Sequence, residues 1–133
     1  MATKMTAVTN NSPYLFQLYN WINGGTTKQD EVEILGNGKT TSTLGKDNDY
    51  ILIPDATPPV QYFSLDNMAF WNLNGDHPNF FVWKTNGGTM YWTLNGPPYP
   101  SALGTKIEGG DTIDEVVLTI TGSTSFTLSV AAS

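Results

Sequence analysis

The chain contains 133 residues with 12 acidic and 6 basic side chains, which gives a formal net charge of -6. This length suits a single domain over residues 1–133, since domains most often contain about 100–150 residues. All six basic residues are lysines, so the chain lacks the guanidinium group that binds phosphate bidentately. Together with the acidic balance, this argues against nucleic acid as a partner.

Membrane and export signals are not visible in this sequence. No stretch reaches the roughly 18 apolar residues of a transmembrane helix. The N-terminal residues show no basic start followed by an apolar run, as a signal peptide would. We therefore expect a protein that is cytoplasmic, or released without a signal peptide.

The composition favours strands over helices. Uncharged polar residues are abundant, with 18 Thr, 12 Asn and 8 Ser, and threonine is enriched in strands. Thirteen glycines and eight prolines divide the chain into segments of about 5–9 residues, the usual length of strands. There is no cysteine, which excludes disulfides and thiolate metal sites.

Apolar and polar residues alternate in short segments, as they do in half-buried strands. In chain order these segments are Tyr14–Trp21, Glu31–Leu35, Tyr50–Ile53, Val60–Leu65, Met68–Leu73, Phe80–Thr85, Thr89–Leu94, Glu115–Thr121 and Ser125–Val130. Asn10–Ser12 precedes the first of them and is interpreted as a turn. Thr27–Asp30 carries the only helical signal, an incomplete capping box that predicts one turn at most. Gly122-Ser123 predicts a two-residue type II′ hairpin turn.

About nine or ten short strands at regular spacing predict an all-β fold. We expect a single-domain antiparallel β-sandwich, because few of the strands are apolar on both faces. A closed β-barrel is the alternative. In the last predicted strand, alternation places Phe126, Leu128 and Val130 in the core.

A Trp-x-x-Asn-Gly pattern occurs three times, beginning at Trp71, Trp83 and Trp92. Asn-Gly is a strong turn signal, so each copy predicts a tryptophan near a strand end just before a turn. In an up-down meander, successive turns fall at opposite ends of the sheet. The turns after Trp71 and Trp92 then share one end, together with two polar-aromatic loops, Asp76–Asn79 and Pro97–Pro100.

Alternation also separates the two faces of these strands. Trp71 and Trp92 share a phase with aliphatic neighbours and are expected in the core. The opposite phase places four residues outside, next to the two loops: Phe70, Asn72, Tyr91 and Thr93. Exposed rings among short polar side chains suit sugar recognition, because a ring covers the C–H surface of a sugar while polar groups bind its hydroxyls.

The sequence therefore predicts a lectin-like protein that binds a neutral glycan or glycoconjugate without catalysis. A neutral glycan requires no arginine, which agrees with the composition. The predicted ligand-binding residues are Asn72, Asp76, His77, Tyr91, Asn95 and Tyr99.

No catalytic site, metal site or cofactor is predicted. His77 is the only histidine and no serine lies in a Gly-x-Ser-x-Gly elbow, so neither a nucleophile–base pair nor a zinc site is apparent. The acidic segments Asp47–Asp49 and Asp111–Glu115 lack the spacing of an EF-hand loop, and we interpret them as turns.

Two other classes of function stay open. In size, turn density and aromatic content the chain is similar to small cysteine-free lectins, and also to β-sandwich cytolysins related to actinoporins and aegerolysins. The second similarity implies membrane association, for which exposed Trp and Tyr are suited. The other class is a structural or assembly subunit, in which an aromatic surface patch is a protein interface. A homo-oligomer is compatible with each class.

Overall fold

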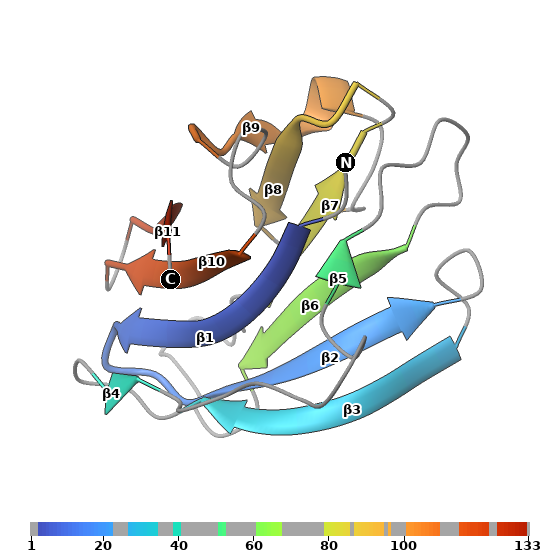
Figure 1. The fold of residues 1–133 in the computed structure, drawn as a ribbon. Coiled ribbons are helices and arrows are strands. Elements are labelled where there is room, and N and C mark those ends of the chain that lie inside the picture. The colour runs from blue at the N-terminus through green and yellow to red at the C-terminus, as the bar shows by residue number, and fades with distance from the viewer. Residues whose placement is uncertain are drawn as a thin grey trace.

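Within the residues that it describes, the computed structural model contains strands and one 3-10 helix, η1 (Ser101–Leu103) (Figure 1). It describes residues 3–22, 27–34, 39–40, 51–52, 61–67, 79–85, 87–94, 96, 101–109, 115–122 and 125–132. The strands in these ranges are β1 (Thr3–Asn11), β2 (Phe16–Ile22), β3 (Thr27–Ile34), β4 (Lys39–Thr40), β5 (Ile51–Leu52), β6 (Tyr62–Asn67), β7 (Asn79–Lys84), β8 (Met90–Leu94), β9 (Thr105–Lys106), β10 (Glu115–Thr121) and β11 (Thr127–Ala132).

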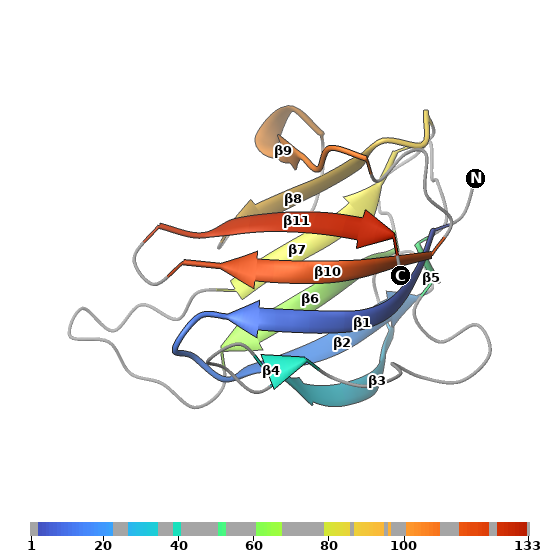
Figure 2. The same ribbon diagram turned by 60° about the vertical axis from the view of Figure 1, so that its left-hand side comes forward.

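The strands form two sheets that pack face to face. One sheet has five strands in the order β11-β10-β1-β4, with β5 also paired to β1. The other has six strands in the order β3-β2-β6-β7-β8-β9. Figure 2 shows the five-stranded sheet in front and the six-stranded sheet behind it. The predicted all-β sandwich is confirmed, and the two sheets are not closed into the alternative barrel.

Most predicted strands are present, with small differences at their ends. They correspond to β2, β3, β5, β6, β7, β8, β10 and β11, whereas β1, β4 and β9 were not predicted. The predicted strand Met68–Leu73 lies outside the described residues.

β1 lies in the middle of the five-stranded sheet although the sequence predicts no strand there. It runs parallel to β10, with Val8 beside Leu118, while the other pairs among the described strands are antiparallel. A register shift between Met5 and Ala7 interrupts the alternation. Met5 and Val8 therefore both point into the core although they are three positions apart. This irregularity explains why the segment lacks a period-2 pattern.

The connection from β1 to β2 is built around the buried side chain of Asn10. Its Oδ1 accepts hydrogen bonds from the backbone N–H of Ser12 at 3.0 Å and from the Ser12 hydroxyl at 2.6 Å. Its Nδ2 donates to the carbonyl oxygen of Tyr14 at 2.7 Å. The turn predicted at Asn10–Ser12 is present but displaced to residues 12–14, because Asn10 still belongs to β1.

The core lies between the two sheets and contains side chains from both. Leu128 is buried, while Phe126 and Val130 are half-buried and pack against the core, so the predicted inward face of β11 is confirmed. Trp92 is buried as predicted. Thr93 lies on the outer face as predicted, beside Phe81, but it is only 7% exposed.

The weak helical signal at Thr27–Asp30 forms no helical turn. Thr27–Asp30 is extended and begins β3, where Lys28 pairs with Trp21. Backbone pairing with β2 outweighs the local capping signal at this position.

The predicted two-residue turn between β10 and β11 is also replaced. Thr121 pairs with Thr127, so residues 122–126 connect the two strands. Gly122 has a φ of 121°, and a β-carbon there would collide with the carbonyl oxygen of Ser125. Glycine is therefore required at position 122, as predicted, but the connection is longer than two residues. Phe126, at the end of this connection, packs against the core.

Candidate binding face of the six-stranded sheet

The structure describes one of the six predicted ligand-binding residues. Tyr91 lies in β8, half-buried, with its neighbours Met90 and Trp92 in the core. The other five lie outside the described residues: Asn72, Asp76, His77, Asn95 and Tyr99.

The strand directions agree with one premise of the predicted loop site. β6 and β8 each run antiparallel to β7, so both strands finish at the same end of the sheet. The predicted alternation of turns requires this arrangement. Contact between the loops Asp76–Asn79 and Pro97–Pro100 stays a prediction.

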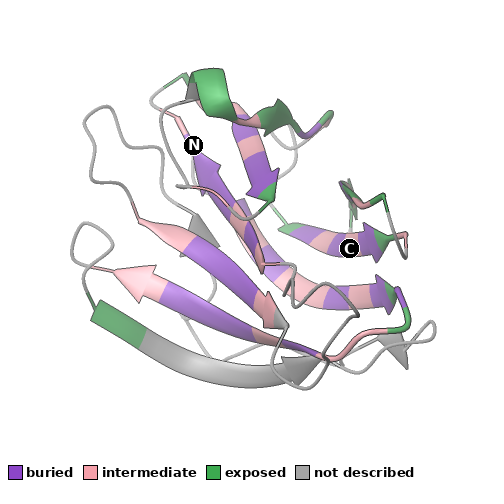
Figure 3. Cartoon of the chain, turned by 180° about the vertical axis from the view of Figure 1, so that it is seen from behind, coloured by how far each residue is buried: buried purple, intermediate pink, exposed green. Residues whose placement is uncertain are grey.

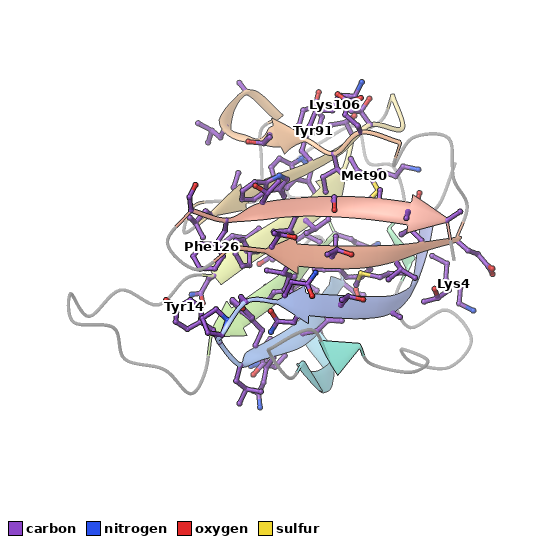
Figure 4. The ribbon with its side chains drawn as sticks, turned by 90° about the vertical axis from the view of Figure 1, so that its left-hand side faces the viewer. Lys4, Tyr14, Met90, Tyr91, Lys106 and Phe126 are labelled. Atoms are coloured by element: carbon purple, nitrogen blue, oxygen red, sulfur yellow. The ribbon has the colours of Figure 1, made fainter. Side chains whose placement is uncertain are left out.

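A row of aromatic residues crosses the outer face of the six-stranded sheet, opposite the core. The row consists of direct cross-strand partners on the four adjacent strands β2, β6, β7 and β8, and we call it the aromatic row: Trp21, Tyr62, Trp83 and Tyr91. Their chain neighbours on β6, β7 and β8 belong to the core, which places the row on the other face. Lysines 28 and 106 pair with the two ends of the row. Figure 4 shows Tyr91 and Lys106 together at one edge of the sandwich.

The rings of the aromatic row contact one another and Phe81. Trp21 and Tyr62 are stacked, with ring centroids 5.6 Å apart and 14° between their planes. Trp83 and Tyr91 are stacked at 5.9 Å and 23°. Tyr62 also meets the ring of Phe81 edge to face at 5.8 Å. Except for Trp83 these rings are half-buried, so part of each reaches solvent and offers apolar surface to a ligand.

Trp83 is covered by the chain segment that follows β8. It is only 1% exposed although it does not face the core. A β-carbon at Gly104 would lie 2.5 Å from Cη2 of Trp83, so the backbone passes directly over the indole. The N–H of Ile107 donates to the carbonyl oxygen of Met90 at 2.9 Å, and the Ile107 side chain is buried. Figure 3 shows η1 and β9 as an exposed edge beside the buried part of β8.

A hydrogen-bonded chain connects the aromatic row to a carboxylate. Nε1 of Trp21 donates to Oγ of Ser64 at 2.8 Å. The Ser64 hydroxyl bonds to the carboxylate of Asp66. Lys28 extends over the same region, with Nζ 4.2 Å from the ring centroid of Tyr19 and 6.0 Å from that of Trp21. These contacts link the side chains of Trp21, Ser64, Asp66, Tyr19 and Lys28 into one group on the outer face.

Three polar residues form a second line across the same face, which we call the polar row. Asp66 pairs with Gln17 on one side and with Asn79 on the other, and all three are half-buried. Burial raises the pKa of Asp66 above its ordinary value of 3.8, while the hydrogen bond from Ser64 and the charge of Lys28 act in the opposite direction. The outer face thus combines aromatic rings, a carboxylate and carboxamides.

Other polar features lie away from this face. Lys84 is buried on the core side of β7, and its Nζ donates to Oγ1 of Thr3 at 2.7 Å, which joins the two sheets. Within the described residues, no group of three or more His, Cys, Asp or Glu side chains is placed to hold a metal ion. The described part of the chain also contains no helix long and apolar enough to cross a membrane.

The polar row was not predicted from the sequence. The alternation in two strands could have indicated it, because their outward-facing residues are a mixture of aromatic and polar side chains. In β2 these residues are Gln17, Tyr19 and Trp21, and in β6 they are Tyr62, Ser64 and Asp66. The sequence does not show the register in which β2 and β6 pair, and this register decides which of these residues lie side by side.

The fold and this face together define an all-β sandwich with an aromatic and polar sheet surface. No protein-family model, no curated protein and no solved structure matches the chain.

Proposed function

We propose that the protein is a non-catalytic carbohydrate-binding protein, and that a neutral glycan or glycoconjugate binds on the outer face of the six-stranded sheet. The observation that supports this function is the presence of the aromatic row and the polar row on one face. A sugar carries C–H groups and hydroxyls on the same ring, so its binding site needs apolar rings and directional polar groups close together.

The dimensions of the face suit an oligosaccharide. Trp21 and Gln17 are four positions apart on β2, which corresponds to about 13 Å at roughly 3.3 Å per residue. The aromatic row crosses four strands that lie about 4.8 Å apart. Phe81 lies between the two rows on β7 and is half-buried, whereas three residues on the same face are almost fully buried: Tyr19, Ser64 and Thr93. The accessible surface therefore consists of the half-buried members of the two rows together with Phe81.

The charges on the face favour a neutral ligand over an anionic membrane. Binding to anionic lipid normally recruits clusters of Lys and Arg. Here Asp66 lies on β6 in the middle of the sheet, while Lys28 and Lys106 lie on the edge strands β3 and β9. A net charge of -6 acts in the same direction.

The direct test is binding of the purified protein to a glycan array, followed by the variant Tyr62→Ala. Removing this half-buried ring takes away apolar contact surface in the aromatic row, and we expect binding to weaken about tenfold. Thr119→Ala is the matched control, because Thr119 lies on the outer face of the other sheet. Circular dichroism and thermal melting establish that both variants are folded.

Each result has a distinct meaning. If the wild-type protein binds no glycan, the proposed function is wrong, and binding to zwitterionic liposomes in its place supports the cytolysin-like alternative. If Tyr62→Ala binds glycans as the wild type does while Tyr99→Ala or Asp76→Ala does not, the glycan occupies the predicted loops and not the sheet face.

A further inference from the structure

We propose, on the basis of the proposed function, that Gln17 and Asp66 form a donor–acceptor pair that selects sugars with two neighbouring free hydroxyl groups. Asp66 is the specificity-determining residue of this pair, and Gln17 is its partner. This inference names the part of a neutral glycan that the outer face recognises.

Gln17 and Asp66 are held side by side by the sheet. They are direct partners in the β2–β6 register, and both are half-buried on the outer face. Direct cross-strand partners have β-carbons about 4.5–5.5 Å apart, so their polar ends reach adjacent groups of one sugar ring.

The hydrogen bonds of Gln17 present its amide as a donor. The hydroxyl of Tyr19 donates to Oε1 of Gln17 at 2.7 Å, which occupies the amide oxygen. The amide nitrogen carries two N–H donors. A sugar hydroxyl that approaches Gln17 therefore accepts a hydrogen bond from it.

The hydrogen bonds around Asp66 present its carboxylate as an acceptor. Ser64 accepts a hydrogen bond from Nε1 of Trp21, so its own proton is directed to Asp66. A carboxylate has about four lone-pair sites, and Ser64 occupies one of them. A second sugar hydroxyl can donate to those that remain, and a hydrogen bond to a charged acceptor is stronger than a neutral one.

The surroundings of the pair fit the rest of a sugar ring. Phe81 is the direct partner of Ser64, so its half-buried ring lies diagonal to Asp66 and can cover C–H groups. Asn79 flanks Asp66 on the other side. The carboxylate repels sulfated or carboxylated sugars, which agrees with a neutral ligand.

The experiment measures binding of the methyl glycosides of glucose, galactose and mannose, together with their single-deoxy derivatives, by titration calorimetry and array inhibition. For the wild-type protein, we expect removal of either hydroxyl of one neighbouring pair to weaken binding about tenfold or more, because the bound sugar would cover Gln17 or Asp66 and leave it without a hydrogen-bond partner. Asp66→Asn keeps the size of the side chain and replaces the carboxylate. We expect this variant to lose about tenfold in affinity and to discriminate less between the parent sugar and the deoxy derivative.

Two controls keep the outcomes separate. Thr119→Ala on the other sheet is expected to bind as the wild type does. Gln17→Glu preserves shape but replaces the amide donor; it is measured alongside Asp66→Asn and decides the question alone if Asp66→Asn does not fold. It too should reduce the discrimination. If the wild type binds these sugars and both variants retain its affinity and selectivity, the pair has no such role, although the protein still binds carbohydrate. If the wild type binds none of the glycosides and no array glycan, the proposed function itself is wrong, and the role of the pair with it.

Discussion

Gly104 lies directly against the indole ring of Trp83. A β-carbon at position 104 would lie 2.5 Å from Cη2 and 2.9 Å from Cζ2 of Trp83, and 3.0 Å from Cβ of Tyr91. The absence of a side chain at position 104 therefore allows the segment after β8 to pack directly against Trp83. As a result, Trp83 is buried, while Trp21, Tyr62 and Tyr91 in the same row are partly accessible to solvent.

We predict that Gly104→Ala destabilises the protein by about 1–3 kcal/mol, because an added methyl group overpacks a site where the indole is enclosed. Tryptophan fluorescence should also shift as Trp83 becomes more exposed. Gly87→Ala is the matched control: the nearest atom to its β-carbon is Oγ1 of Thr85 at 4.0 Å, an ordinary contact. Equal urea midpoints for the two variants would show that the contact at Gly104 relaxes without cost.

A second prediction tests the core of the sandwich. Leu128→Ala should destabilise the fold by about 2–5 kcal/mol, because Leu128 is only 3% exposed and the lost side chain leaves a cavity. Leu103→Ala removes the same atoms from a side chain that is 58% exposed, and its effect should stay within about 0.5 kcal/mol. Urea denaturation measures both. A similar loss in the two variants would contradict the observed packing of β11.

The architecture could be predicted because the alternation in most strands is regular. Val116, Leu118 and Ile120 alternate with outward residues along β10, and the predicted bounds of that strand, Glu115–Thr121, are those observed. β1 escaped prediction for a physical reason: its bulge between Met5 and Ala7 removes the period, and its partner β10 lies at the other end of the chain. Parallel pairing of this kind leaves no local signal.

Only the types of side chain in the candidate site could be predicted from the sequence. The sequence indicates exposed aromatic and short polar side chains, and Tyr91 belongs both to the predicted set and to the aromatic row. The register between strands decides which residues meet, and it depends on packing of whole strands. Gln17 and Asp66 are distant in the chain and adjacent in the sheet, so neither stood out in the sequence.

A third prediction concerns the link between the two sheets through Lys84. Its Nζ donates to Oγ1 of Thr3, and both side chains are buried at 1% exposure. Thr3→Val keeps the shape but removes this acceptor from a buried ammonium group, so we expect a loss of about 1–3 kcal/mol. Thr119→Val, at a half-buried position on the outer face of the same sheet, is the control and should change stability little. Chemical denaturation at neutral pH compares them, and an equal effect in both variants would show that Thr3 contributes nothing specific to Lys84.

The last prediction follows from the environment of Asp66. Burial raises its pKa in the folded state above the ordinary 3.8, so the folded protein holds this proton more tightly than the unfolded chain does. The resulting contribution to stability is complete below pH 3.8 and is lost as the pH rises through the folded-state pKa. Asp66→Asn cannot titrate, so its stability relative to the wild type should increase over that pH window and then level off. Unfolding by urea at a series of pH values measures the difference, and the NMR titration of the Asp66 carboxyl carbon measures the pKa itself. A folded-state pKa below 3.8 would mean that the hydrogen bond from Ser64 and the charge of Lys28 outweigh burial, and the stability difference would then change with pH in the opposite direction.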